Sequence, residues 1–136
     1  MINKKITIYS DGGARGNPGP AGIGAVLYDC ELNIIAEISE YIGETTNNQA
    51  EYKAMLAGME KAKALDAEEL ICYLDSELVV KQMKREYKVK NKDLALLFIR
   101  AYNLSQGFKS IEFVHVRREK NKVADGLANM AMDTHA

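Results

Sequence analysis

Three strand-like segments follow one another before any helical pattern begins, and this order constrains the fold more than any other feature of the sequence. Residues 4–10 alternate apolar and polar side chains, residues 23–28 form a short apolar run, and a third such segment spans 34–42. Neighbouring strands with short connections pair most simply as an antiparallel meander. The stretch 11–22 is too rich in Gly and Pro for a regular element, so we expect a shaped loop there.

Helical periodicity begins near residue 46 and then alternates with strand patterns. Thr46 and Gln49 match a capping box, and apolar residues at helical spacing follow to Leu65. The later elements, in chain order, are a strand at 69–74, a helix from the Asp75-Ser76 cap to Met83, a helix at 93–105, a strand at 111–116 and a helix at 122–132 capped by Asn121. We therefore expect a single α/β domain, residues 1–136, with a five-stranded mixed sheet: three antiparallel strands, then two parallel strands, flanked by helices.

Residue types predict several buried positions and the cellular setting. The last helix is expected to bury Val123, Leu127 and Met130 on one stripe. Cys30 and Cys72 have no C-x-x-C partner, so we expect buried free thiols in a reducing compartment. No apolar stretch of about 18 residues occurs and no signal region precedes the first strand, so we expect a cytoplasmic protein without membrane contact. A monomer is the default expectation.

The charges are unevenly distributed although they nearly cancel. The chain has 18 basic and 19 acidic residues, a formal net charge of −1. Residues 81–92 carry six basic residues against one acidic residue, and residues 109–122 carry five against two. Such segments are commonly solvated faces, but they also suit a nucleic-acid partner. The acidic residues must therefore be concentrated elsewhere.

Four of these acidic residues occupy conspicuous positions. Asp11 and Asp75 each follow a strand, whereas Glu51 and Asp125 lie in the first turns of helices. Singly, each is explained as a turn, a cap or a helix-dipole residue. In an α/β sheet, however, strand ends and adjoining helix N-termini gather where strand direction switches. We expect all four carboxylates to converge there.

Converging carboxylates repel one another strongly unless cations neutralise them. A site made only of oxygen ligands suits Mg²⁺ or Mn²⁺ better than Zn²⁺, which prefers His and Cys. Two such ions about 3.5–4 Å apart can promote in-line phosphoryl displacement. An anionic metal site beside cationic segments therefore predicts chemistry on a polyphosphate strand.

The remaining polar candidates each have a structural alternative. His115, near the end of the last strand, is either a hydrogen-bonded structural residue or a proton-transfer group, a role for which histidine side chains in general are suited. Asn17, Asn47 and Asn48 are turn and cap residues or donors to hydroxyls and base edges. The glycines meet neither the dinucleotide nor the P-loop fingerprint.

Four blocks of the sequence resemble the signature blocks of type 1 ribonuclease H. They are DGGARGNPGPAG at 11–22, TTNNQAE at 45–51, DS at 75–76 and KVADGLAN at 122–129, and the resemblance covers essentially the whole chain. It implies a ribonuclease H-like fold and an endonuclease that hydrolyses the RNA strand of RNA·DNA hybrids. It further implies two Mg²⁺ or Mn²⁺ ions and products with 3′-hydroxyl and 5′-phosphate ends.

The resemblance also assigns roles to residues. It implies metal binding and catalysis by the four acidic residues above, with His115 as the family's mobile histidine. It implies substrate contacts, including those to RNA 2′-hydroxyls that distinguish RNA from DNA, at Gly12, Gly13, Asn17, Thr46, Asn47, Asn48 and Ser76.

The sequence departs from many family members in one segment. They insert a helix and a basic loop, the handle, where only residues 85–92 connect two predicted helices here, so the chain resembles the handle-less branch of bacteria and archaea. Glu77 stands where relatives often carry Gln, which weakens any expected substrate contact there. Because some handle-less relatives also cut double-stranded RNA, that activity stays open.

Two other functions remain as alternatives. The basic segments are also typical of a catalytically silent nucleic-acid-binding module on the same fold, and related sheets carry integrase- or transposase-like nucleases. A binder gains nothing from carboxylates that face phosphates, and no DNA-targeting domain is evident in residues 1–136. The metal-dependent nuclease is therefore the favoured interpretation.

Overall fold

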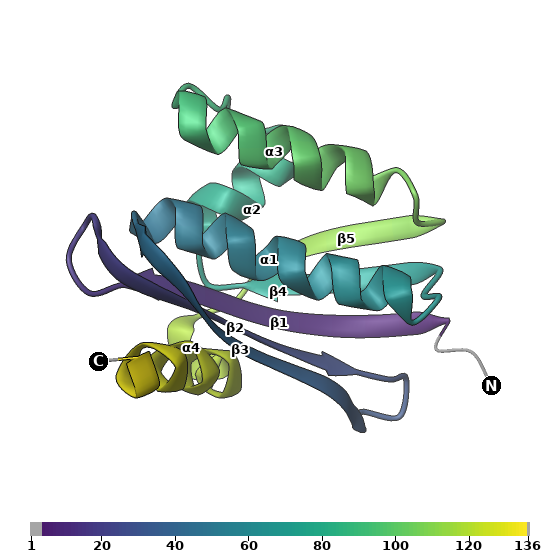
Figure 1. The fold of residues 1–136 in the computed structure, drawn as a ribbon. Helices are drawn as coiled ribbons and strands as arrows, with labels where there is room; N and C mark the ends of the chain where they lie inside the picture. Colours follow the sequence, from purple (N-terminus) through teal and green to yellow (C-terminus); the bar gives the residue numbers. More distant parts are fainter. Residues whose placement is uncertain (1–3, 136) are drawn as a thin grey trace.

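The computed structural model describes residues 4–135, with five strands and four α-helices (Figure 1). In chain order the elements are β1 (Lys5–Ala14), β2 (Gly19–Tyr28), β3 (Ile34–Thr45), α1 (Asn47–Ala64), β4 (Glu69–Leu74), α2 (Glu77–Met83), α3 (Lys92–Ser105), β5 (Ser110–His115), the 3₁₀ turn η1 (Arg118–Lys120) and α4 (Lys122–His135). Among these residues, no helix has the length and apolar character needed to cross a lipid bilayer.

The strands form one mixed sheet in the order β3-β2-β1-β4-β5. β1 pairs with β2 and β2 with β3 in antiparallel fashion, whereas β1 with β4 and β4 with β5 are parallel pairs. This confirms the predicted sheet. α1, α2 and α3 lie on one face, and α4 lies on the other, against β1, β2 and β3 (Figure 1).

The main core lies between the sheet and α1. Ile6 and Ile8 of β1 point into it, and the predicted apolar face of α1 meets them with Tyr52, Met55 and Met59, all fully buried. Thr46 caps α1 as predicted, because its side chain accepts a hydrogen bond from the Gln49 N–H at 3.2 Å. The start of α1 is thereby fixed beside the ends of the central strands.

The predicted loop at 11–22 is wrong: β1 and β2 continue through it, and only residues 15–18 form the turn. Glycines are needed in these strands because helix backbones approach them. A Cβ at Gly12 would lie 2.1 Å from the Ala50 carbonyl oxygen of α1, and one at Gly24 would lie 2.2 Å from the Ala124 oxygen of α4. The β1–β2 hairpin is thus held closely from both faces of the sheet.

We expect Gly24→Ala to lower the free energy of unfolding by about 1–3 kcal/mol, because the methyl group must displace the α4 backbone. Gly126→Ala is the matched control: it lies in α4 with nothing within 4 Å of the added Cβ, and helix propensity favours Ala there. Urea denaturation measures both variants. Equal stability of Gly24→Ala and the wild-type protein would contradict the close approach.

Expectations about the last helix also need correction. α4 buries Ala124, Ala128, Ala131 and Met132, whereas Val123 and Met130 are exposed and Leu127 is half-buried. Small side chains face the sheet because the helix backbone lies so close to the glycines of β2.

Two single-residue expectations are wrong as well. The Asn121 side chain does not cap α4, because its amide donates to the Ser10 carbonyl oxygen at 2.9 Å instead. Cys72 is buried as predicted, but Cys30 is exposed. Cys30 lies in the turn after β2, where the carboxylate of Asp29 accepts hydrogen bonds from the N–H groups of Glu31 and Asn33.

Candidate active site

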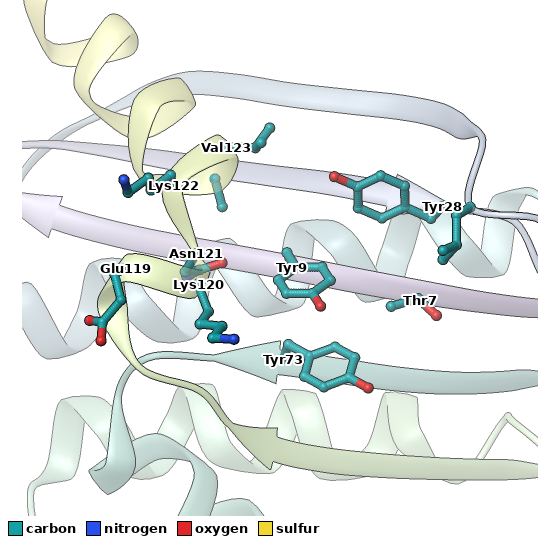
Figure 2. Close-up of a pocket in the computed structure, with 11 residues that line it drawn as sticks. Thr7, Tyr9, Tyr28, Tyr73, Glu119, Lys120, Asn121, Lys122 and Val123 are labelled. Carbon is teal, nitrogen blue, oxygen red and sulfur yellow. The ribbon is translucent and has the colours of Figure 1, made fainter.

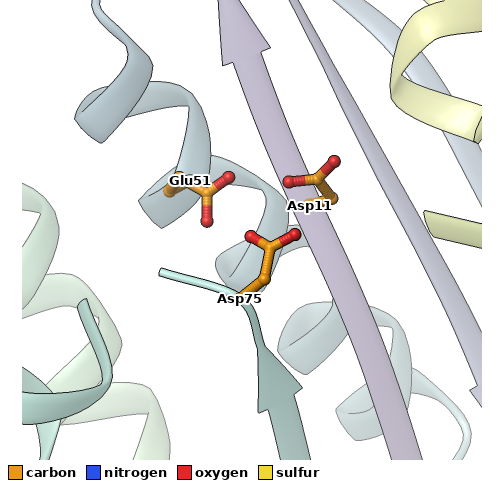
Figure 3. A group of neighbouring side chains, drawn as sticks. All are labelled: Asp11, Glu51 and Asp75. Atoms are coloured by element: carbon orange, nitrogen blue, oxygen red, sulfur yellow. The ribbon is translucent and has the colours of Figure 1, made fainter. Parts of the chain in front are cut away.

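Three carboxylates converge at one end of the central strands. Asp11 on β1, Glu51 on α1 and Asp75 directly after β4 each place an oxygen within 4.8 Å of the other two, and Figure 3 shows their side chains pointing toward one another. Ser10 pairs with Leu74 in the parallel β1–β4 ladder, so the acidic residues that follow them emerge side by side. The parallel pairing predicted from the sequence therefore brings these carboxylates together.

Glu51 is positioned by the glycine that lets α1 approach β1. The Gly12 N–H donates a hydrogen bond of 2.9 Å to Glu51 Oε1, and this bond is buried. Glu51 Oε2 is also buried but has no hydrogen-bond partner among the described residues. A buried oxygen without a partner is costly unless a proton or a cation meets it.

Electrostatics of this cluster favour protonated carboxyls when no cation is present. Burial, together with its hydrogen bond and repulsion with Glu51, raises the pKa of Asp11 well above its usual range. Burial likewise raises the pKa of Glu51, although hydrogen bonds to Asp11 and the Gly12 N–H oppose the shift. Asp75 adds repulsion that raises both pKa values. A bound proton or cation would therefore stabilise the cluster.

Asp125 of α4 faces the same cleft but lies outside the close group of three. Its carboxylate is 3.5 Å from Arg118 Nη2 and accepts a hydrogen bond of 3.3 Å from Asn129 Nδ2. The acidic cleft, about 500 Å³ in volume, is lined by Asp11, Gly12, Gly13, Ala14, Arg15, Asn47, Glu51, Asp75, Ser76, Arg118, Asp125, Ala128, Asn129 and Met132. All four predicted carboxylates thus share one cleft.

His115 lies beside this cleft and not in it. It ends β5, where it pairs with Leu74, the residue before Asp75, and its side chain is exposed. It is absent from the lining of the acidic cleft. The structure therefore places the histidine on the strand next to Asp75, outside the carboxylate group.

The predicted substrate-binding residues lie around the first turn of α1 and the β1–β2 hairpin. Asn47 Oδ1 accepts a hydrogen bond of 2.7 Å from the Ala14 N–H, and Asn17 Oδ1 accepts one of 3.1 Å from the Asn47 N–H. These bonds tie the hairpin turn to the start of α1. Asn48 is exposed beside them.

Ser76 combines two positions that matter for the site. Its hydroxyl caps α2 by accepting a hydrogen bond of 3.3 Å from the Val79 N–H, and the residue lines the acidic cleft. Gly13 also lines the cleft, whereas the Gly12 N–H is already used by Glu51. Thr46, the α1 cap, lies next to Asn47 without lining the cleft.

The residues at the cleft fit a divalent cation. Asp11, Glu51 and Asp75 offer only carboxylate oxygens, the ligands that Mg²⁺ and Mn²⁺ prefer. The unpartnered Glu51 Oε2 is a donor atom that the protein itself does not satisfy. A cluster of carboxylates of this kind indicates the use of a divalent metal ion. Asp125, which lines the same cleft, could supply a further oxygen ligand.

Comparison with known proteins agrees with this geometry. A family model described as reverse transcriptase-like matches residues 9–131. The crystal structure of RNase H1 from the archaeon Halobacterium salinarum superposes with a TM-score of 0.93 at 41% identity, covering 96% of this chain and 98% of that one. The chain belongs to the ribonuclease H family. Its structural neighbours include bacterial and archaeal enzymes of type 1.

Two further relatives bear on the organisation of this ribonuclease H domain. Bifunctional protein Rv2228c of Mycobacterium tuberculosis is 46% identical over 133 residues, which are 97% of this chain and 36% of that protein. The chain thus spans about a third of the length of its mycobacterial relatives. LC11-RNase H1, solved in complex with an RNA/DNA hybrid, is 45% identical with a TM-score of 0.91 and covers 96% of this chain and 98% of its own.

The connection between α2 and α3 is short. α2 ends at Met83 and α3 begins at Lys92, with no helix between them in the described part of the chain. A basic connection of residues 84–91 remains, in which Lys84 pairs with Glu86 at 3.7 Å. In the described part of the chain, the segment between these two helices is therefore short and basic.

Sequence reasoning missed a basic side chain of the cleft that contacts one of the carboxylates. Arg118 lines the acidic cleft, contacts Asp125 and counteracts the raised pKa of Glu51. In the sequence it is only one charge of the basic segment 109–122. Arg118 lies seven residues before Asp125, on the turn that leads into α4. This position could have predicted a place at the cleft, because the turn must pass the strand ends.

Proposed function

We propose that the chain hydrolyses the RNA strand of RNA·DNA hybrids, leaving 3′-hydroxyl and 5′-phosphate ends. The observation that carries this proposal is the buried group Asp11, Glu51 and Asp75, with its unpartnered oxygen, on the lining of an open cleft. The family and a hybrid-bound relative at 45% identity support the substrate. A monomer and a cytoplasmic location with reduced cysteines belong to the proposal.

The acidic residues would hold two Mg²⁺ or Mn²⁺ ions. When bound, such ions supply an activated water and stabilise charge on the leaving oxygen. Gly12 fixes the orientation of Glu51 through its N–H, and Asp75 is fixed by the strand end from which it emerges. Arg118, at the cleft beside Asp125, would attract a phosphate of the strand.

Substrate recognition would use the polar groups around the start of α1. Asn17, Asn47 and Asn48 flank the cleft from the hairpin turn and the helix, where amide groups can contact 2′-hydroxyls. We assign Gly12, Gly13, Thr46 and Ser76 to the same surface, since Gly12, Gly13 and Ser76 line the acidic cleft and Thr46 caps the helix beside it.

A gel assay of labelled duplexes tests the function directly. The wild-type chain should cut the RNA strand of an RNA·DNA duplex with Mg²⁺ or Mn²⁺ and should not cut it with EDTA. Matched RNA·RNA and DNA·DNA duplexes decide whether double-stranded RNA is also a substrate, and mass spectrometry identifies the product ends. Hybrid binding without turnover in either metal at several pH values would instead support the silent binding module.

We expect His115→Ala to lower turnover by about 100-fold, the contribution of a proton-transferring group, with little change in hybrid affinity. The reason is its position on the strand beside Asp75, where an exposed imidazole can reach the leaving oxygen or the product phosphate. Single-turnover rates and hybrid titrations measure the two effects separately. His135→Ala, near the end of α4, is the control, and an equal effect of both substitutions would remove His115 from catalysis.

A further inference from the structure

A second cavity lies on the α4 face of the sheet, beside the site described above (Figure 2). This tyrosine cavity has a volume of about 430 Å³ and is lined by Thr7, Tyr9, Tyr28, Leu32, Tyr73, Glu119, Lys120, Asn121, Lys122, Val123 and Ala124. None of its tyrosines takes part in the proposed hydrolysis. Its chemistry therefore needs its own explanation.

Three tyrosines from three adjacent strands form one aromatic surface. Tyr9 and Tyr73 are paired across the parallel β1–β4 ladder, and their rings stack at 14° with centroids 4.7 Å apart. Tyr28 meets Tyr9 edge to face, with centroids 5.9 Å apart. All three are half-buried, while their neighbours on the opposite face, such as Ile8 and Cys72, are fully buried. The aromatic surface is thus left open between β4 and α4.

Asn121 points an unsatisfied acceptor into this cavity. The side chain is only 1% exposed, and its Nδ2 donates to the Ser10 carbonyl oxygen at 2.9 Å and to Asp75 Oδ2 at 3.4 Å. Among residues 4–135, no group donates to Asn121 Oδ1. Figure 2 shows this oxygen on the side of the residue that faces Tyr9. The cavity therefore presents an acceptor that calls for an N–H donor from a ligand.

Charge at the rim favours an anionic ligand. Lys120 and Lys122 lie on either side of Asn121 and are exposed, whereas Glu119 is the acidic residue of the lining. A ligand that satisfies the whole cavity has a flat ring, an N–H donor on that ring and an attached anionic group. These are the features of a nucleotide.

We propose that the tyrosine cavity binds a nucleotide, with its base against Tyr9 and Tyr73, a base N–H donated to Asn121 Oδ1 and its phosphate beside Lys120 and Lys122. Base–aromatic stacking of this kind is tolerant of sequence. The nucleotide is either free or an unpaired residue of a strand that flanks the hybrid, and this second source rests on the proposed function.

The position of the cavity suits either source. Tyr9 and Tyr73 each stand two residues before a carboxylate of the site, Asp11 and Asp75, and strand alternation places Tyr9 and Asp11 on one face of β1. The segment 118–125 separates the two cavities, since it contributes residues to both linings. A strand that leaves the acidic cleft would need to pass this short segment to reach the tyrosines.

Two-dimensional ¹H–¹⁵N NMR spectra of the full chain test the proposal. EDTA is present so that no substrate is hydrolysed during the measurement. Cytidine 5′-monophosphate should produce saturable shifts at the Tyr9 and Tyr73 amides and at the Asn121 side-chain amide. We expect Tyr73→Leu to weaken this binding by about tenfold or more, the effect of losing one stacking partner. Tyr102→Leu on α3, on the other face of the sheet, is the control and should leave binding unchanged. Lys120→Ala should weaken the monophosphate but not cytidine.

Each arm of the experiment decides something. The proposal would be overturned if inorganic phosphate alone gave the same shifts. It would also be overturned if no nucleotide probe shifted the signals of these residues. A hybrid with a single-stranded extension shifting these signals, while a blunt hybrid does not, identifies the source as a flanking strand. Shifts with the free monophosphate alone identify a free nucleotide. Cleavage by the wild-type chain is measured separately, so failure of the proposed hydrolysis is distinguishable from failure of this site.

Discussion

Asp11→Asn should reduce Mg²⁺-dependent cleavage of the RNA strand by about 100- to 1,000-fold, while hybrid affinity in EDTA stays within a few fold of the wild-type value. Asp11 is the member of the cluster that contacts Glu51 and is repelled by Asp75. The substitution keeps the shape but removes a charge that the cations must balance, and loss of one such preorganised group typically costs about 100- to 1,000-fold in rate. Initial rates and gel-shift titrations with the same hybrid measure both quantities.

Asp66→Asn is the matched control for this substitution. Asp66 is an exposed residue with a φ of 62° in the turn after α1, a conformation that Asn also tolerates, and it lies away from the acidic cleft. It removes the same charge from the chain, so its rate should equal that of the wild-type protein. Full activity of Asp11→Asn, or an equal loss in both variants, would contradict the role of the cluster.

The central part of the site was predictable because it depends on topology. Asp11 and Asp75 follow strands that the element order makes parallel neighbours, so their convergence needs no knowledge of side-chain packing. Glu51 lies one turn into a helix whose start the capping pattern at Thr46 predicts. Local signals of this kind survive in the folded protein because each one is consistent with the global arrangement.

The parts that sequence reasoning missed depend on contacts between distant segments. Local patterns place Gly12 in a loop and Gly24 in a short apolar strand, but the role of both glycines is set by helix backbones at residues 50 and 124. Asn121 has the sequence position of a helix cap, yet its amide reaches Ser10, far back in the chain. Neither kind of partner can be inferred from neighbouring residues, because only the packed helices bring them within reach.

The link between the acidic cluster and stability gives the second large effect. Without divalent cations, Asp11 and Glu51 have raised pKa values in the folded chain because they are buried beside other carboxyls. In the unfolded chain they titrate near their ordinary values of about 4. The folded state therefore binds more protons than the unfolded state from about pH 4 upward through the raised pKa values, and the free energy of unfolding falls as pH rises.

In EDTA, we expect the wild-type chain to lose at least about 1 kcal/mol of stability between pH 5 and pH 8, since a tenfold difference in proton affinity between the folded and unfolded chain corresponds to about 1.4 kcal/mol.

Mg²⁺ binds the deprotonated carboxylates, so its stabilising effect should be larger at pH 8 than at pH 5. Asp11→Asn should be more stable than the wild-type chain in EDTA at pH 8, lose that advantage at pH 5 and respond weakly to Mg²⁺. Thermal unfolding followed by circular dichroism at both pH values, with EDTA or Mg²⁺, measures these differences. If the melting temperature of the wild-type chain in EDTA is independent of pH, the carboxyls are already ionised and separately solvated. The cluster would then need no cation to neutralise it, and this result would contradict the proposed metal site.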